Sequence, residues 1–434
     1  MSFFAFNDQI EILDVSSYGQ ACTQRKQGSL YGGEDCLYLN VFMHTKHIPI
    51  TEGLMLPVAF WIHGGTYISG DASQYDAQEI INLYDGHVIL VTINYRLNIF
   101  GFLGSEELRQ LDVESGSTGT LGLQDQRLAM QWVQDNIVSF GGDVNAITLY
   151  GQSAGAGSIS SHLSMKKSQG LFSAVILESG GFAPWIAQNM TNAQKVYENV
   201  LQQSQCFNLT CLQELSTSEL YDISQLIQPV TNILPTAFIP AVDFVELFAH
   251  PWVTLSTGTN ITNVPILLGT NADEGVSYLP ATTPTTLTEF EFFYMLIRLF
   301  DFGEYREEIE ELYLTNATYP EEYDSSGALY SEYWWAGQRF IGDYFFSCPT
   351  QYALEQLLSE TRRAGCVTTD TNVPEDLYCS EMFAYHNQYQ LANRGAFVQH
   401  GYELPLVFHL GEHLTTEADV SIADKVATYW VRAA

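Results

Sequence analysis

The sequence predicts an α/β fold in which a mostly parallel β-sheet is covered by helices. Apolar runs rich in β-branched residues alternate along the chain with helical patterns, and this alternation is typical of parallel sheets. The runs are almost continuously apolar, as expected for strands that are buried on both faces. The chain has no internal repeat and no low-complexity linker, so we expect a single domain over residues 1–434.

Individual elements follow from the local patterns. The stretch 123–137 predicts a helix that places Leu128, Trp132 and Val133 on one apolar face. Residues 285–360 are mostly helical in pattern, which predicts a second layer or a cap over the sheet. The runs that predict buried strands, each ending in Gly or polar residues, are 58–65, 87–96, 146–151, 174–180 and 264–275.

Composition and charge exclude several partners. The 434 residues include 17 Lys+Arg and 50 Asp+Glu, a formal net charge of −33 that argues against nucleic acid and anionic membrane surfaces. We interpret the acidity mainly as a source of solubility. A content of 46% hydrophobic residues supports a large core, and no apolar run is long enough for a membrane span.

Cysteines and glycosylation sequons favour the secretory pathway. Seven cysteines are present, and Asn-x-Ser/Thr sequons begin at Asn189, Asn208, Asn260 and Asn316. The first residues do not resemble a signal peptide, because Asp8 and Glu11 interrupt the apolar stretch. We therefore expect a secreted or secretory-pathway protein whose signal peptide is not in this chain.

The stretch Gly-Gln-Ser-Ala-Gly at 151–155 follows a predicted strand and precedes a possible helix. Gly-x-Ser-x-Gly at such a turn is the pattern of a nucleophile elbow, in which small neighbours leave the serine oxygen clear. This pattern arises by chance roughly once in six chains of this size. Alone, it leaves two alternatives open: Ser153 is a nucleophile, or it is an ordinary serine in a Gly-rich loop.

A nucleophilic serine needs a base and a carboxylate that orients the base. Asp273 and Glu274 follow a predicted strand, as the acid of an α/β-hydrolase should, whereas His250 precedes them. His400 is favoured as the base because it follows a loop and precedes a glycine; the candidate histidines beyond the acid are His386, His400, His409 and His413. Backbone N–H groups for an oxyanion are expected from Ala154 and from the Gly64–Gly65 loop.

Seven segments together resemble the type-B carboxylesterase/cholinesterase family. They occur in the family's order and span nearly the whole chain: EDCLYLNVF (34–42), WIHGG (61–65), NYRLNIFGFL (94–103), GLQDQRLAMQWVQDNIVSFGGD (122–143), LYGQSAGAGS (149–158), LLGTNADEG (267–275) and HGYELPLVF (400–408). The resemblance implies an α/β-hydrolase fold, a serine esterase and no cofactor. It implies a triad of Ser153, Glu274 and His400, with Glu274 preferred over Asp273 because the family's acid is the Glu before Gly.

Further residue roles are implied by the same resemblance. The oxyanion would be held by the N–H groups of Gly65, Thr66 and Ala154, and Ser179 would support the triad, although a plain loop serine is an equal alternative. Arg96 and Asp125 would form a structural ion pair. Disulfides are expected for Cys22 with Cys36 and for Cys206 with Cys211. We add Cys366 with Cys379 as a bridge within a local insertion. Cys348 is then left over: in many relatives its partner lies near the C-terminus, beyond the end of this chain, and the alternative is a free buried thiol.

The sequence departs from the family in four ways. Relatives have further strands at both ends, so we expect the domain to be truncated there, lacking N-terminal and C-terminal portions. Thr66 stands where Gly or Ala is usual and can crowd the acyl group, and Gln152 replaces the common Glu. The Cys22–Cys36 loop lacks the tryptophan that binds quaternary ammonium groups in cholinesterases, which weighs against choline esters.

Two alternatives to a small-molecule esterase are considered. A catalytically silent adhesion or scaffold protein is the main one, because such members exist in the family, but silent members typically lose the nucleophile. A metal site is not expected, because HTKH (44–47) and HLGEH (409–413) lack the metalloprotease arrangement. The aromatic run at 333–335 could line a pocket, but core packing is the more common role.

Overall fold

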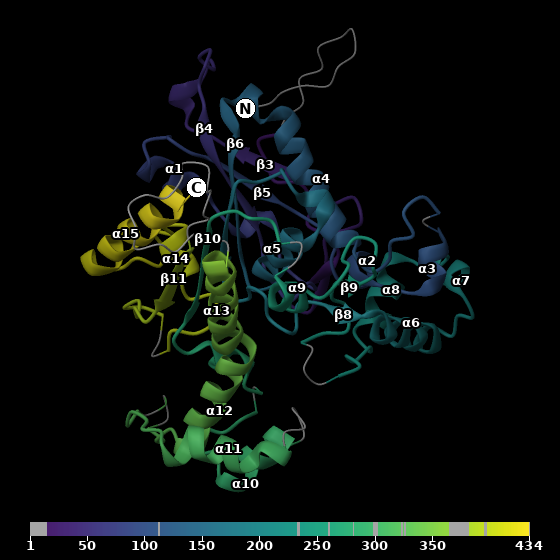
Figure 1. Cartoon of the computed structure of the whole chain (residues 1–434), viewed down its shortest axis with the longest axis vertical. Coiled ribbons are helices and arrows are strands. Elements are labelled where there is room, and N and C mark those ends of the chain that lie inside the picture. Colours follow the sequence, from purple (N-terminus) through teal and green to yellow (C-terminus); the bar gives the residue numbers. More distant parts are fainter. Residues whose placement is uncertain are drawn as a thin grey trace.

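A seven-stranded β-sheet forms the centre of the protein in its computed structural model (Figure 1). The structure describes residues 15–433 except 112, 232–234, 259–260, 281, 298–302, 323, 325–326, 364–381 and 395–396. The strand order is β11-β10-β7-β6-β4-β5-β3, and every neighbouring pair is parallel except β3 with β5. The bounds are β3 (Leu39–Phe42), β4 (Leu56–Ile62), β5 (Ile89–Ile93), β6 (Gly142–Gln152), β7 (Ala174–Glu178), β10 (Ile266–Asn271) and β11 (Met382–Asn387).

Side chains alternate between the two faces of this sheet, as the period of two in a strand requires. In β4, Val58, Phe60 and Ile62 belong to the larger hydrophobic core, whereas Ala59 and Trp61 belong to a smaller one on the opposite face. Because both faces are buried, the strands read as continuous apolar runs. All five runs predicted from the sequence contain a strand, whereas β3 and β11 were not predicted.

Helices cover both faces (Figure 1). The larger core includes residues of α2, α4, α5, α6, α9, α12 and α13, and the smaller core includes residues of α1, α14 and α15. The helices on the larger core are α2 (Asn98–Phe102), α4 (Leu121–Asn136), α5 (Ala154–Ser164), α6 (Met190–Ser204), α9 (Pro251–Thr257), α12 (Glu332–Gly342) and α13 (Cys348–Arg363). Those on the opposite face are α1 (Gln78–Leu83), α14 (Leu404–Val407) and α15 (Glu417–Ala433).

The remaining elements are short. Two-stranded sheets are formed by β1 (Gln24–Lys26) with β2 (Ser29–Tyr31) and by β8 (Gln188–Asn189) with β9 (Ala241–Val242). The other helices are α3 (Glu106–Leu111), α7 (Leu209–Gln213), α8 (Thr217–Ser224), α10 (Glu289–Met295) and α11 (Arg306–Glu310). Figure 1 shows α10 to α12 extending away from the sheet. None of the helices within the described ranges is both long and apolar enough to cross a membrane.

One predicted helix face was partly wrong. In α4, Val133 is fully buried and Trp132 packs against the core, but Leu128 is 65% exposed. The buried stripe instead includes Leu123 and Met130, which lie ten and three residues before Val133, respectively, and so share its side of the helix. In the aromatic run at 333–335, Trp334 and Trp335 are buried in the core.

The sheet brings four loops to one edge. In parallel strands all carboxyl ends lie at the same edge, where α/β proteins bind their ligands. At that edge the Gly-rich loop at 63–70 follows β4, Ser153 follows β6 and Ser179 follows β7. The Asp273–Glu274 pair lies just beyond the end of β10.

Candidate active site

Ser153 lies at the tip of a sharp turn between a strand and a helix. β6 ends at Gln152 and α5 begins at Ala154, so Ser153 alone forms the junction. Its backbone has φ 56° and ψ −122°, a strained conformation for a residue with a side chain. A Cβ on Gly155 would lie only 2.0 Å from the carbonyl oxygen of Ile62, so this close crossing requires glycine.

Glu274 and His400 are joined by a short hydrogen bond. Oε2 of Glu274 lies 2.6 Å from Nδ1 of His400, and the two side chains are 1% and 12% exposed. Glu274 opens a 3-10 helix over Glu274–Tyr278, and His400 sits on the turn before α14. A carboxylate that accepts from Nδ1 leaves Nε2 of the neutral imidazole as a proton acceptor, the tautomer that a general base needs.

The other oxygen of Glu274 is held by two donors. The Ser179 hydroxyl donates to Oε1 at 2.5 Å and the backbone N–H of Asn271 donates to it at 2.7 Å. Ser179 directly follows β7 and Asn271 is the last residue of β10, so the sheet itself fixes the position of the carboxylate. Ser179 therefore contacts the acid of the candidate triad directly.

Asp273, the alternative acid, has different partners. Its Oδ2 accepts from the backbone N–H of Val398 at 3.0 Å, and its Oδ1 lies 3.5 Å from Nη2 of Arg339. Asp273 thus ties the loop that carries His400 to the end of β10. The other candidate histidines also bond elsewhere: His386 contacts Thr270, His409 pairs with Asp424 and His413 with Glu412.

The Gly-rich loop packs directly against the serine. A Cβ on Gly64 would lie 3.1 Å from Cβ of Ser153. Gly65 has φ 105°, and a Cβ there would lie 2.1 Å from the carbonyl oxygen of Ser69, so only glycine fits. The backbone N–H groups of Gly65, Thr66 and Ala154 donate to no other residue that the structure describes, which leaves them available to a ligand.

Thr66 and Tyr67 continue this loop with positive φ values of 57° and 62°. For a β-branched residue such as Thr66 this is a rare conformation and a costly one. Tyr67 is fully buried, and its ring meets Phe102 edge-on with centroids 5.1 Å apart. The buried tyrosine thereby holds the strained turn in place.

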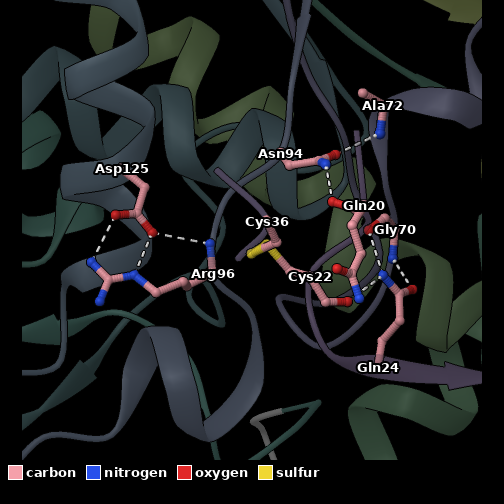
Figure 2. Close-up of a disulfide and its surroundings, with 9 residues drawn as sticks. All are labelled: Gln20, Cys22, Gln24, Cys36, Gly70, Ala72, Asn94, Arg96 and Asp125. Atoms are coloured by element: carbon pink, nitrogen blue, oxygen red, sulfur yellow. Dashed lines mark hydrogen bonds and ion pairs between the residues drawn. A yellow bond between two sulfur atoms is a disulfide. The ribbon is translucent and has the colours of Figure 1, made fainter. Parts of the chain in front are cut away.

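The far end of the loop is clamped by the disulfide-bonded N-terminal segment (Figure 2). The Gln24 side chain donates to the carbonyl oxygen of Gly70 at 2.8 Å and accepts from its N–H at 2.9 Å. The Cys22–Cys36 disulfide anchors the segment two residues before Gln24. The Gly-rich loop is therefore supported within its length by Tyr67 and at its far end by Gln24.

Several predicted structural pairs lie away from the serine. Nη2 of Arg96 lies 2.7 Å from Oδ1 of Asp125, and Nε donates to Oδ2, which makes a bidentate pair (Figure 2). A disulfide also joins Cys206 to Cys211. Cys348 is a free thiol and is exposed, so its predicted burial was wrong. Cys366 and Cys379 lie outside the described residues.

One polar contact within the site was not predicted. The side-chain nitrogen of Gln152 lies 2.9 Å from Nε2 of His400. No hydrogen bond joins Ser153 to His400, although both lie within the described part of the chain. The sequence marked Gln152 only as a replaced Glu.

Two buried carboxylates lie behind the triad. Glu178 ends β7 and accepts from the Trp430 indole at 2.6 Å, while Glu403 accepts from the Asn271 side chain. Burial, with repulsion from Glu274 as the next cause, raises the pKa of Glu403 to about 7. Burial and then the charge of Glu403 raise the pKa of Glu178 well above its usual value.

The histidine pairs that could suggest a metal have other contacts. His44 accepts from the backbone N–H of Lys46, and His47 bonds to the carbonyl oxygen of Gly86. Among the residues that the structure describes, no group of three or more His, Cys, Asp or Glu side chains could hold a metal ion.

Comparison with known proteins identifies the family. The model of the carboxylesterase family matches residues 8–434. An acetylcholinesterase of Bungarus fasciatus is 36% identical over 290 residues, which cover 62% of this chain and 46% of that protein. A para-nitrobenzyl esterase of Bacillus subtilis (strain 168) is 35% identical over 279 residues, 61% of this chain and 54% of that protein.

A more extended match exists to acetylcholinesterase 1 of Caenorhabditis briggsae, 29% identical over 432 residues, with 92% of this chain and 64% of that protein covered. The chain thus spans 46% to 64% of the length of these three relatives. The two disulfides are consistent with a secreted protein. The family match confirms both the resemblance and the predicted α/β-hydrolase fold: the chain belongs to the carboxylesterase family.

Proposed function

We propose that this protein hydrolyses carboxylic esters of small molecules through an acyl-enzyme intermediate. Ser153 is the nucleophile, His400 the general base and Glu274 the residue that orients His400. The observation that carries the proposal is the 2.6 Å bond from Glu274 to His400 beside a serine at the tip of a strained elbow. Family membership supports the same reaction class.

The reaction would proceed in two steps. In the first, Ser153 Oγ bonds to the ester carbonyl carbon while its proton moves to Nε2 of His400. The oxyanion accepts from the N–H groups of Gly65, Thr66 and Ala154, and His400 then protonates the departing alcohol. In the second, water loses a proton to His400, attacks the acyl carbon and releases the acid, which restores Ser153.

The surroundings of His400 favour uncharged esters. Phe346 lies against the imidazole with ring centroids 4.5 Å apart, and Tyr278 meets it edge-on at 5.3 Å. The loop closed by Cys22 and Cys36 contains no tryptophan to bind a quaternary ammonium group. We therefore propose apolar esters rather than choline esters, although two of the relatives described above are named acetylcholinesterases.

Location and organisation are part of the proposal. Two disulfides and three exposed sequons, at Asn189, Asn208 and Asn316, support passage through the secretory pathway; Asn260 lies outside the described residues. The continuous match over residues 8–434 supports one domain over residues 1–434. The excess of acidic residues supports the absence of nucleic-acid partners.

A catalytically silent member of the family is the second candidate function. The specific observation in its favour is that Nε2 of His400 bonds to Gln152 rather than to Ser153. Against it, all three residues of the candidate triad are present.

Steady-state hydrolysis of p-nitrophenyl acetate, butyrate and longer esters tests the proposal. We expect turnover by the wild type and a loss of at least about 1,000-fold in Ser153→Ala. Ser218→Ala, on the exposed face of α8, is the matched control and should keep the wild-type rate. Equal rates in Ser153→Ala and the wild type would refute the esterase and leave the silent alternative.

A further inference from the structure

The base of the candidate triad is bonded to a residue outside the triad. Nε2 of His400 is 2.9 Å from the amide nitrogen of Gln152. The lone pair that must take the serine proton is therefore engaged elsewhere. This arrangement differs from one in which the serine is already bonded to its base.

The protonation of His400 follows from its two neighbours. Glu274 accepts at Nδ1, so Nδ1 carries the hydrogen of the neutral ring. An amide nitrogen can only donate, so Gln152 donates to the lone pair on Nε2. That lone pair is the only site on neutral His400 that can take the proton of Ser153.

The Gln152 side chain is held between two glycines. Its amide oxygen would lie 2.9 Å from a Cβ on Gly64, and its amide nitrogen 3.6 Å from a Cβ on Gly401. It therefore bridges the oxyanion loop and the turn that carries His400. Gln152 is only 5% exposed, so the amide has little access to water as an alternative partner.

We propose that Gln152 is a positioning residue that holds the resting base away from the serine by donating to Nε2 of His400. The inference rests on the proposed function, since it concerns the availability of the same base. This bond must be exchanged for the Ser153–His400 bond before the serine attacks, so it adds to the barrier of acylation.

Removing this bond should therefore accelerate the reaction of Ser153. A neutral hydrogen bond contributes enough to change a rate by about two- to tenfold. We expect this gain in Gln152→Met, which keeps the side-chain length without a donor. A residue with a merely structural role would give a loss of rate instead.

The test measures the second-order rate constant for labelling by a fluorophosphonate reagent. Ser153 Oγ bonds to phosphorus, fluoride leaves, and the serine proton passes to His400. The variant is Gln152→Met, with Gln203→Met on the exposed side of α6 as the matched control. We expect the control to react at the wild-type rate and Gln152→Met to react faster.

Labelling of Gln152→Met at or below the wild-type rate, in protein that labels at Ser153, would overturn the inference and leave the proposed function intact. A wild type that never labels would count against the proposed function instead. In that case crystal structures of the wild type and Gln152→Met decide the inference without any activity. We expect Nε2 of His400 to face Gln152 in the wild type and Ser153 in the variant; a Ser153–His400 bond in the wild type would overturn it.

Discussion

Oε2 of Glu274 and Nδ1 of His400 lie 2.6 Å apart although 126 positions separate the two residues in the chain. The bond fixes which imidazole nitrogen is free, so removing the carboxylate charge should remove the correct tautomer. We expect Glu274→Gln to lower kcat by about 1,000- to 10,000-fold with little change in KM, measured on p-nitrophenyl butyrate.

The neighbouring acid provides a matched control for that prediction. Asp273 bonds to Val398 and Arg339 rather than to His400, so the same acid-to-amide change at Asp273 should cost less than about tenfold in kcat. A comparable loss in Asp273→Asn and Glu274→Gln would mean that the bond to His400 has no special role.

The clamp between Gln24 and Gly70 should matter for both stability and rate. Gln24→Leu removes two hydrogen bonds to the end of the oxyanion loop, which should lower the free energy of unfolding by about 1–3 kcal/mol. It should also lower kcat, because the N–H groups of Gly65 and Thr66 lose their fixed placement. Urea unfolding and steady-state kinetics measure the two effects. Gln203→Leu, on the exposed side of α6, should change neither.

A buried histidine should make the protein sensitive to acid. Burial lowers the pKa of His162 to about 3, and its ring nitrogens bond to Ser168 and Gln126. In the unfolded chain the pKa of this histidine is about 6.5. Below that pH the unfolded chain binds a proton that the folded protein does not, so stability falls with falling pH until about pH 3. His63 and His250, whose pKa values burial lowers to about 4, act in the same direction.

Comparison with His162→Gln isolates this effect. The free energy of unfolding of the wild type, relative to that of the variant, should fall by about 1.4 kcal/mol for each pH unit below 6.5. Urea unfolding at pH 7, 6 and 5 measures this difference. A difference in stability that stays constant over this range would contradict burial of the neutral ring.

Glu403 should have the opposite pH dependence. Its pKa is raised to about 7 in the folded protein, so the folded state binds a proton that the unfolded chain has lost between pH 4.5 and 7. Stability should therefore fall as pH rises through this window. Relative to the wild type, the free energy of unfolding of Glu403→Gln should rise by about 1.4 kcal/mol for each pH unit in this window, because the amide does not ionise in the core. An advantage that does not grow from pH 5 to pH 7 would show that Glu403 ionises without cost.

Local sequence patterns predicted the sheet well, because strands buried on both faces leave an unmistakable apolar run. They were weaker for α4. Leu128 and Val133 both fit an apolar stripe on a short stretch, and only packing against the sheet shows which stripe is buried. β11 was missed because four of its residues alternate between exposed and partly buried positions, so it lacks the apolar run of the central strands.

The candidate site was predictable where chain order carried the information. Gly-x-Ser-x-Gly placed Ser153 on an elbow, and the family resemblance separated Glu274 from Asp273. The contact between Gln152 and His400 joins residues 248 positions apart, and no local pattern reports which atom a side chain meets across such a distance.

The central claim is that Ser153 carries the acyl group. Its most direct test is the intact mass of the protein after reaction with a fluorophosphonate, followed by peptide mapping. We predict one adduct per chain, located on Ser153, and no adduct in Ser153→Ala. An unmodified wild type, or a Ser153→Ala variant that gains the same mass, would contradict this account.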